Sequence, residues 1–132
     1  MTIFYADDDQ EDQEIFREVV LALDPNATII FANTAFDALR ILEELPTPPD
    51  AMFFDLNMPM MTGIECVKSV RATSRYKHTP IVIFSTTSNA VEVKAAIDAG
   101  ADKFLVKPNS YVELQDELRQ ILGFRMHLYG CC

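Results

Sequence analysis

The chain alternates short apolar runs with longer segments in which apolar residues recur every three or four positions. Five of the short runs have the length and composition of β-strands, and turn residues or charged residues bound them. They cover residues 2–6, 27–32, 51–55, 81–84 and 102–106. Because these runs are apolar at consecutive positions, they predict strands in a sheet that is covered on both faces.

Five segments between and after these runs show the apolar spacing of amphipathic helices. Counted from the capping residue where one is evident, they cover residues 10–23, 34–45, 63–75, 89–99 and 110–122. Side chains able to cap these helices are Asn33 or Thr34, Ser88 or Asn89, and Ser110. Helix ends are indicated by Asp24-Pro25-Asn26, by Pro46-Thr47-Pro48-Pro49 and by Gly100.

Strands and helices therefore alternate along the whole chain, which predicts an α/β fold. Right-handed crossovers between parallel strands give a single doubly wound five-stranded parallel sheet flanked by five helices. A length of 132 residues fits one domain over residues 1–132, and no repeat or linker divides it. Residues 126–132 either extend the last helix or form a frayed C-terminal tail.

Composition narrows the possible environments and partners. The formal net charge of −9 argues against nucleic acid or an anionic membrane as the main partner. No apolar run approaches the ~20 residues of a membrane span, and the N-terminus does not resemble a secretory signal. The odd cysteine count, Cys66, Cys131 and Cys132, has no disulfide-framework spacing and fits a reducing compartment. We therefore expect a soluble, cytoplasmic protein.

Polar side chains follow the strands at the points where they leave the core. These residues are Asp7, Asp8 and Asp9 after the first strand, Asp55 at the end of the third, Ser85 and Thr86 after the fourth, and Lys107 after the fifth. Taken singly, each has an ordinary explanation as a helix cap, a turn residue or a solvated lysine. Because the carboxyl ends of parallel strands meet at the ligand-binding edge of an α/β sheet, their joint placement predicts a site.

The chemistry of this predicted site follows from its charges. Two carboxylates about 4 Å apart repel by roughly 4 kcal/mol at an effective dielectric near 20, so the cluster favours a cation. Oxygen ligands of this kind suit Mg²⁺. Asp55 would then act as a nucleophile that accepts a phosphoryl group. Mg²⁺ and Lys107 would neutralise charge on the phosphoryl oxygens, and Ser85 would donate a hydrogen bond to them.

Taken together, these motifs resemble the receiver domain of two-component response regulators, of the stand-alone chemotaxis type. The resemblance covers Thr2 to about Leu122. It is carried by Asp7-Asp8, by Asp55-Leu56-Asn57-Met58-Pro59 with Gly63, by Ser85 and by Lys107-Pro108. It implies a flavodoxin-like, CheY-like sheet with strand order 2-1-3-4-5.

The resemblance also implies a role for each site residue. Asp55 is similar to the phosphorylated aspartate of the family. The implied direct Mg²⁺ ligands are Asp8, Asp55 and the backbone oxygen of Asn57, with Asp7 acting through water. Pro59 and Gly63 would shape the turn after the third strand.

Further roles concern the response to phosphorylation. Ser85 is similar to the switch hydroxyl of the family, and Phe104 to its switch aromatic residue, which would reshape the face formed by the fourth helix, fifth strand and fifth helix. The Lys107–Pro108 bond is often cis in such domains. Thr86 stands where the family usually carries Ala or Gly, and we hypothesise that it slows hydrolysis of the phosphoryl group. Asp9, a third consecutive acid, is interpreted as a helix-start residue.

The resemblance implies partners of two kinds. A sensor histidine kinase or a histidine phosphotransfer protein would donate the phosphoryl group, and an unidentified downstream protein would receive the signal, since we expect no output domain. The chain would be a monomer, or a homodimer through the face formed by the fourth helix, fifth strand and fifth helix.

Two alternatives remain open at this point. A phosphatase of the haloacid-dehalogenase type also forms an aspartyl phosphate, but it uses an acid two residues after the nucleophile, where this chain has Asn57. A receiver-like interaction module that is never phosphorylated would usually have lost some of the residues Asp7, Asp8, Asp55, Ser85 and Lys107, all of which are present here. We therefore expect a signalling protein rather than an enzyme, with at most slow self-dephosphorylation.

Overall fold

The computed structural model describes residues 1–130, with side-chain surroundings described through residue 123. The strands are β1 (Thr2–Ala6), β2 (Thr28–Ala32), β3 (Ala51–Asp55), β4 (Ile81–Ser85) and β5 (Lys103–Val106). The helices are α1 (Gln10–Leu23), α2 (Ala35–Glu44), α3 (Gly63–Arg71), α4 (Ala90–Ala99) and α5 (Tyr111–Gly130). A short 3₁₀ helix, η1 (Ser74–Tyr76), lies between α3 and β4.

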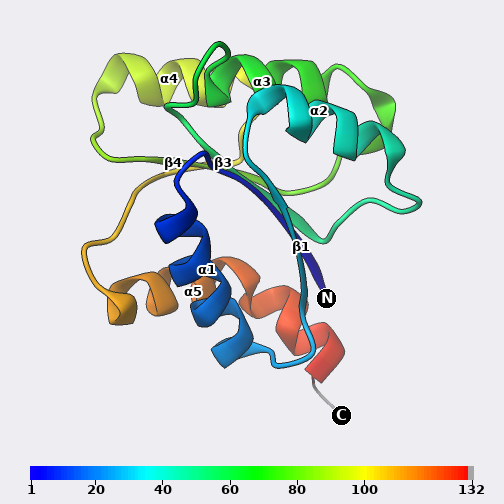
Figure 1. Cartoon of the computed structure of the whole chain (residues 1–132), viewed down its shortest axis with the longest axis vertical. Helices are drawn as coiled ribbons and strands as arrows, with labels where there is room; N and C mark the ends of the chain where they lie inside the picture. Colours follow the sequence, from blue (N-terminus) through cyan, green and yellow to red (C-terminus); the bar gives the residue numbers. More distant parts are fainter. Residues whose placement is uncertain (131–132) are drawn as a thin grey trace.

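The five strands form one parallel sheet in the order β2-β1-β3-β4-β5, which confirms the predicted fold. Helices α1 and α5 pack together on one face, and α2, α3 and α4 cover the other (Figure 1). β3 lies between β1 and β4, so the strand that ends in Asp55 occupies the centre of the sheet.

The two faces bury separate apolar clusters, because neighbouring residues of a strand point to opposite faces. Phe53 packs towards α1 and α5, where its ring lies 5.1 Å from Phe16 and 5.6 Å from Phe84. Phe54 belongs to the cluster under α2, α3 and α4. Every residue of β3 and β4 is buried. This core holds the carboxyl ends of the central strands in fixed positions.

The helix starts are set by single capping side chains. Asp9 caps α1 by accepting hydrogen bonds from the backbone N–H groups of Glu11 and Asp12, which confirms it as a helix-start residue. Of the paired candidates, Thr34 caps α2 and Asn89 caps α4. Ser110 accepts from Glu113 N–H at the start of α5, as predicted.

Other predictions required correction. α3 ends at Arg71 rather than near Arg75, because buried Tyr76 donates its hydroxyl to Leu42 O and draws η1 towards α2. The Lys107–Pro108 bond is trans, so the expected cis bond is wrong. Trans is the intrinsically preferred form, and Lys107 N–H already reaches Ser85 O at 2.6 Å in this geometry.

The C-terminal segment extends the last helix, since α5 continues to Gly130. Cys131 and Cys132 lie outside the described residues. Three side chains of the helical apolar pattern, Phe36, Val91 and Val112, are more than half exposed. Among the helices of the described part of the chain, none combines the length and apolar character that a bilayer span requires.

Candidate functional site

Asp55 closes β3 at the centre of the carboxyl edge of the sheet. Its residue is 4% exposed, and its Oδ1 lies 3.3 Å from the Nζ of Lys107. The turn that follows packs directly against it: a Cβ added to Gly63 would lie 2.3 Å from Asp55 O. A residue without a side chain at position 63 is therefore required for α3 to start this close to the strand.

Asp7 is completely buried, and its carboxylate is held from several sides. It accepts hydrogen bonds from the Tyr5 hydroxyl at 2.5 Å and from Asp9 N–H at 2.9 Å, and it pairs with Lys107 Nζ at 3.1 Å. These contacts leave Asp7 little freedom to rotate. Burial, reinforced by the negative charge of Asp7, raises the pKa of Tyr5 well above its usual range, so its hydroxyl remains a donor.

Asp8 differs from Asp7 because its side chain is exposed. Even so, one carboxylate oxygen from each of Asp7, Asp8 and Asp55 lies within 4.8 Å of the others. Three hard oxygen donors at this separation fit a divalent cation such as Mg²⁺, which takes carboxylates and keeps several waters. The geometry thus brings together the three acids that the sequence predicted to meet.

Lys107 lies next to two of these acids, Asp7 and Asp55, and next to a further acid, Asp12. Its Nζ lies 3.1 Å from Asp7, 2.8 Å from Asp12 and 3.3 Å from Asp55. Burial alone lowers the pKa of Lys107, but the hydrogen bond to Asp12 and the charges of Asp55 and Asp7 raise it above its ordinary value. The ammonium therefore stays charged, and one positive charge faces three carboxylates.

The protonation of Asp55 reflects its surroundings. Burial, followed by the negative charge of Asp7, raises the pKa of Asp55 to about 6. Lys107 and a backbone hydrogen bond from Asn57 act in the opposite direction. At neutral pH Asp55 is mostly ionised, and the cluster then carries more negative than positive charge.

The remaining predicted residues lie around this cluster in different ways. Ser85 is fully buried at the end of β4, and its Oγ accepts a 3.3 Å hydrogen bond from Thr87 N–H. Thr86, next in the chain, is exposed. Phe104 is partly buried and packs against the apolar cluster under α2, α3 and α4. Phe104 is thus on the α4 side of β5, apart from the charged groups described above.

The loop between β3 and α3 is closed by backbone hydrogen bonds. Gly63 N–H donates to Leu56 O at 2.8 Å, and Met61 N–H donates to Pro59 O at 2.8 Å. Met60 adopts a left-handed backbone with φ of 70° and is 89% exposed, whereas Met58 is buried. The loop therefore exposes Met60 to solvent and buries Met58.

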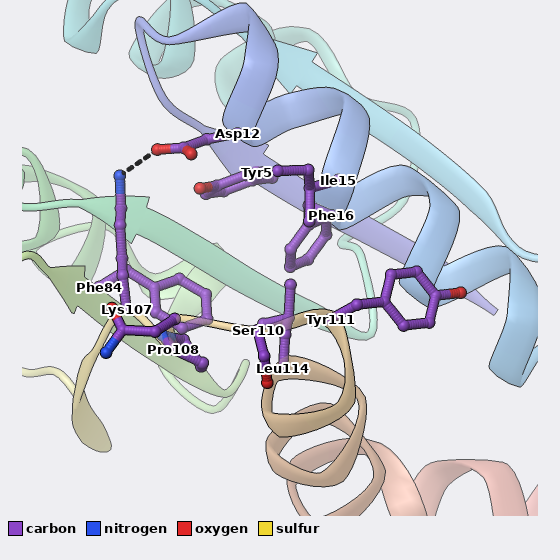
Figure 2. A pocket seen from close by; sticks show the side chains of 11 residues that line it. Tyr5, Asp12, Ile15, Phe16, Phe84, Lys107, Pro108, Ser110, Tyr111 and Leu114 are labelled. Carbon is purple, nitrogen blue, oxygen red and sulfur yellow. Dashed lines mark hydrogen bonds and ion pairs between the residues drawn. The ribbon is translucent and has the colours of Figure 1, made fainter.

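Sequence reasoning missed two residues, Tyr5 and Asp12. Both line a cavity of about 190 Å³ between α1 and the start of α5, next to Lys107 and Pro108 (Figure 2). Tyr5 reads in the sequence as one more apolar strand residue. Asp12 is one of two acids in the first turn of α1, and only the docking of α1 separates it from exposed Glu11.

Comparison with known proteins identifies a family. The family model of the response regulator receiver domain matches residues 3–119. Chemotaxis protein CheY1 of Helicobacter pylori is 41% identical over 69 residues, covering 52% of this chain and 56% of that protein. An uncharacterized transcriptional regulatory protein of Bacillus subtilis, YhcZ, is 32% identical over 123 residues, covering 93% of this chain and 55% of that protein.

A solved structure supports the same assignment. The chemotaxis response regulator CheY4 of Vibrio cholerae has a TM-score of 0.80 and 29% identity, covering 92% of this chain and 98% of that chain. The chain spans about half the length of the curated relatives it matches. Since the family match covers most of the chain and the fold agrees with this relative, the chain belongs to the family of response regulator receiver domains of two-component systems.

Proposed function

We propose that Asp55 accepts a phosphoryl group and that the chain acts as a switch in a two-component phosphorelay. The observation that carries this proposal is the buried carboxylate of Asp55, 3.3 Å from the ammonium of Lys107 and within a cluster of three acids. An ionised carboxylate is a nucleophile, and a fixed positive charge beside it favours the developing charge on phosphoryl oxygens.

The transfer involves one bond formed and one broken. The phosphoryl donor is a phosphorylated histidine of the partner protein. An Asp55 carboxylate oxygen bonds to phosphorus as the bond from phosphorus to the histidine nitrogen breaks, and the leaving imidazole takes a proton. Lys107 balances charge on the phosphoryl oxygens. Ser85, at the buried end of β4, donates a hydrogen bond from its hydroxyl to the phosphoryl group. Thr86, which follows Ser85 in the chain, is exposed and borders the phosphoryl group.

The acids of the cluster would hold Mg²⁺. Asp8, Asp55 and the backbone oxygen of Asn57 would be direct ligands, and Asp7 would act through a water molecule. When bound, Mg²⁺ supplies positive charge that offsets the phosphoryl oxygens. The contacts of Asp7 with Tyr5 and Lys107 support an outer role, since they already occupy its carboxylate.

The donor would be a sensor histidine kinase or a histidine phosphotransfer protein, and the chain itself a signalling protein rather than an enzyme. We propose that phosphorylation reshapes the face formed by α4, β5 and α5, which Phe104 adjoins. Apolar side chains are exposed there, including Val91 at 79%, Val106 at 46% and Val112 at 63%. This face would bind the downstream protein or a second copy of the chain.

Acetyl phosphate with Mg²⁺ tests the proposal, with intact mass spectrometry as the measurement. The wild-type protein should gain the mass of one phosphoryl group, and Asp55→Asn should gain none. Asp98→Asn, which changes an exposed acid of α4, is the matched control and should be labelled like the wild type. Labelling that persists in Asp55→Asn would overturn the proposal.

The same incubation separates the remaining alternatives. A receiver domain releases phosphate no faster than its own phosphoryl group decays, whereas a phosphatase turns over many substrate molecules on a fast, steady time course. An interaction module that is never phosphorylated gives no mass gain at any donor concentration.

A further inference from the structure

Lys107 makes its shortest carboxylate contact with a residue that the proposed chemistry does not use. Its Nζ lies 2.8 Å from Asp12 Oδ2, compared with 3.1 Å from Asp7 and 3.3 Å from Asp55. Figure 2 shows Asp12 projecting from the first turn of α1 towards the end of the Lys107 side chain. The contact joins residues 95 positions apart in the sequence.

The local structure holds both partners in place. Asp9 caps α1 and accepts a 3.2 Å hydrogen bond from Asp12 N–H, which fixes the first helical turn. Phe16, one turn further along α1, is buried against the sheet. On the other side, Lys107 N–H donates to Ser85 O at 2.6 Å. The Asp12–Lys107 pair therefore follows from how α1 and β5 are seated.

The three carboxylates around Lys107 differ in their freedom to move. Asp7 is fully buried and is held by Tyr5 and by Asp9 N–H. The side chain of Asp55 is 6% exposed. The side chain of Asp12 is 35% exposed and, among the hydrogen bonds and ion pairs of the described residues, makes only the contact with Lys107. Asp12 is thus the carboxylate that can most readily give up the ammonium and turn to solvent.

Phosphorylation of Asp55 adds a further acceptor for the ammonium of Lys107. A phosphoryl group on Asp55 adds negative oxygens beside Lys107, and these oxygens compete with Asp12 for the same donor. The charge of Asp12 also repels them across a partly solvated gap. The resting pair therefore opposes the phosphorylated state in two ways.

We propose that Asp12 is a positioning residue that holds Lys107 in the resting state and competes with the phosphoryl group on Asp55 for its ammonium. This inference rests on the proposed function. Removing the charge of Asp12 frees Lys107 for the phosphoryl oxygens and tightens binding of a phosphoryl group at Asp55. Asp12 thereby sets how readily the domain is switched on.

The probe is beryllofluoride, a tetrahedral phosphoryl analogue, titrated calorimetrically in saturating Mg²⁺. Asp12→Asn should bind it about fivefold more tightly than the wild type, as expected for one charge removed at ~6 Å in partly solvated surroundings. Asp12→Glu, which keeps the charge, should return towards the wild-type affinity. Glu11→Gln removes a neighbouring exposed charge that does not contact Lys107 and should stay within about twofold of the wild type.

Mg²⁺ titrated alone gives an independent readout. Asp12 is not among the three clustered acids, so Asp12→Asn should change the affinity for Mg²⁺ less than the affinity for beryllofluoride. The affinity for Mg²⁺ should become weaker, whereas the affinity for beryllofluoride becomes tighter. A purely structural role for Asp12 would lower the free energy of unfolding of Asp12→Asn without tightening beryllofluoride binding.

The outcomes distinguish a failure of the role inferred for Asp12 from a failure of the proposed function. Beryllofluoride binding to the wild type with equal or weaker binding to Asp12→Asn overturns the inference alone. Equal tightening in Glu11→Gln also overturns it, because a general charge effect would then suffice. Failure of the wild type to bind beryllofluoride, together with failure to be labelled by acetyl phosphate, overturns both.

Discussion

Two cationic side chains tie distant segments together at opposite edges of the sheet, and their acceptors differ in kind. At the amino ends of β4 and β5, Arg71 donates to the backbone oxygens of Gly100 at 2.8 Å and Thr79 at 2.7 Å, and pairs with Asp102. At the carboxyl edge, Lys107 contacts three carboxylates within 3.3 Å.

The difference between the two clusters lies in their charge balance. Backbone oxygens are neutral acceptors, so Arg71 and Asp102 leave little net charge. The Lys107 cluster combines one positive charge with three negative charges, and Asp8 adds a fourth nearby. We infer that the first cluster serves stability, whereas the second accepts a further cation and a phosphoryl group at a cost in stability.

The largest expected effect is on the Arg71 cluster. Arg71→Ala should lower the free energy of unfolding by about 3 kcal/mol, because several partly buried carbonyl oxygens lose their donor. Chemical denaturation measures the change, and Mg²⁺ affinity should stay as in the wild type. Lys68→Ala, an exposed change on the same helix, is the control, with an expected effect below about 0.5 kcal/mol. A similarly small effect for Arg71→Ala would contradict the assignment.

The Lys107 cluster should respond in the opposite direction. In Mg²⁺-free buffer near neutral pH, Asp55→Asn should raise the free energy of unfolding by about 2 kcal/mol, because it removes a buried charge from an excess of negative charge. Denaturation of both proteins, repeated with saturating Mg²⁺, measures this gain. The gain should shrink with Mg²⁺, since the ion stabilises the wild-type carboxylates. Destabilisation by Asp55→Asn in Mg²⁺-free buffer would contradict the inference that repulsion among these carboxylates destabilises the folded protein.

The pH dependence of this gain follows from the pKa of Asp55, raised by burial and by Asp7 to about 6. The folded protein binds the Asp55 proton more tightly than the unfolded chain, so stability from this group is complete below pH ~4 and is lost as pH rises through about 6. The difference between wild type and Asp55→Asn should therefore grow over that window and level off above it.

A smaller effect is expected from Mg²⁺ itself. At about ten times its dissociation constant, Mg²⁺ should raise the free energy of unfolding of the wild type by about 1.4 kcal/mol by mass action. Asp8→Asn should lose most of this increment, while Glu14→Gln, an exposed acid further along α1, should keep it. Thermal denaturation with and without Mg²⁺ provides the measurement. An unchanged increment in Asp8→Asn would exclude Asp8 as a direct ligand.

The smallest effect concerns Thr86. If its exposed, branched side chain restricts the approach of water to the phosphoryl group, Thr86→Ala should shorten the lifetime of the labelled protein about two- to threefold. The decay of the mass-shifted species after donor removal measures it, and Thr87→Ala is the control. An unchanged lifetime would remove Thr86 from the site.

The same comparison shows what sequence reasoning could reach. Asp55, Ser85 and Lys107 were predictable because each stands at or just after the end of an apolar run, and the topology of parallel strands brings such ends together. The cap at Asp9 was predictable because capping is local in sequence. These features depend on neighbours along the chain or on one general rule of sheet topology.

Other features depend on how elements dock and left no local signal. Asp12 and Glu11 are equivalent in the sequence, and only the seating of α1 against β5 gives Asp12 the contact with Lys107. The end of α3 depends on Tyr76 reaching α2, a contact between residues 34 positions apart. The Arg71 cluster likewise assembles from α3, η1 and the segment before β5.

The central claim, that the excess negative charge at the carboxyl edge marks a phosphoryl-acceptor site, is tested most directly by locating the phosphoryl group. Borohydride reduction of the labelled protein converts an acyl phosphate on aspartate into homoserine, and peptide mass spectrometry identifies the position. We predict homoserine at position 55 when Mg²⁺ is present and little or none when it is chelated. Homoserine at another aspartate, or equal labelling without Mg²⁺, would contradict the account.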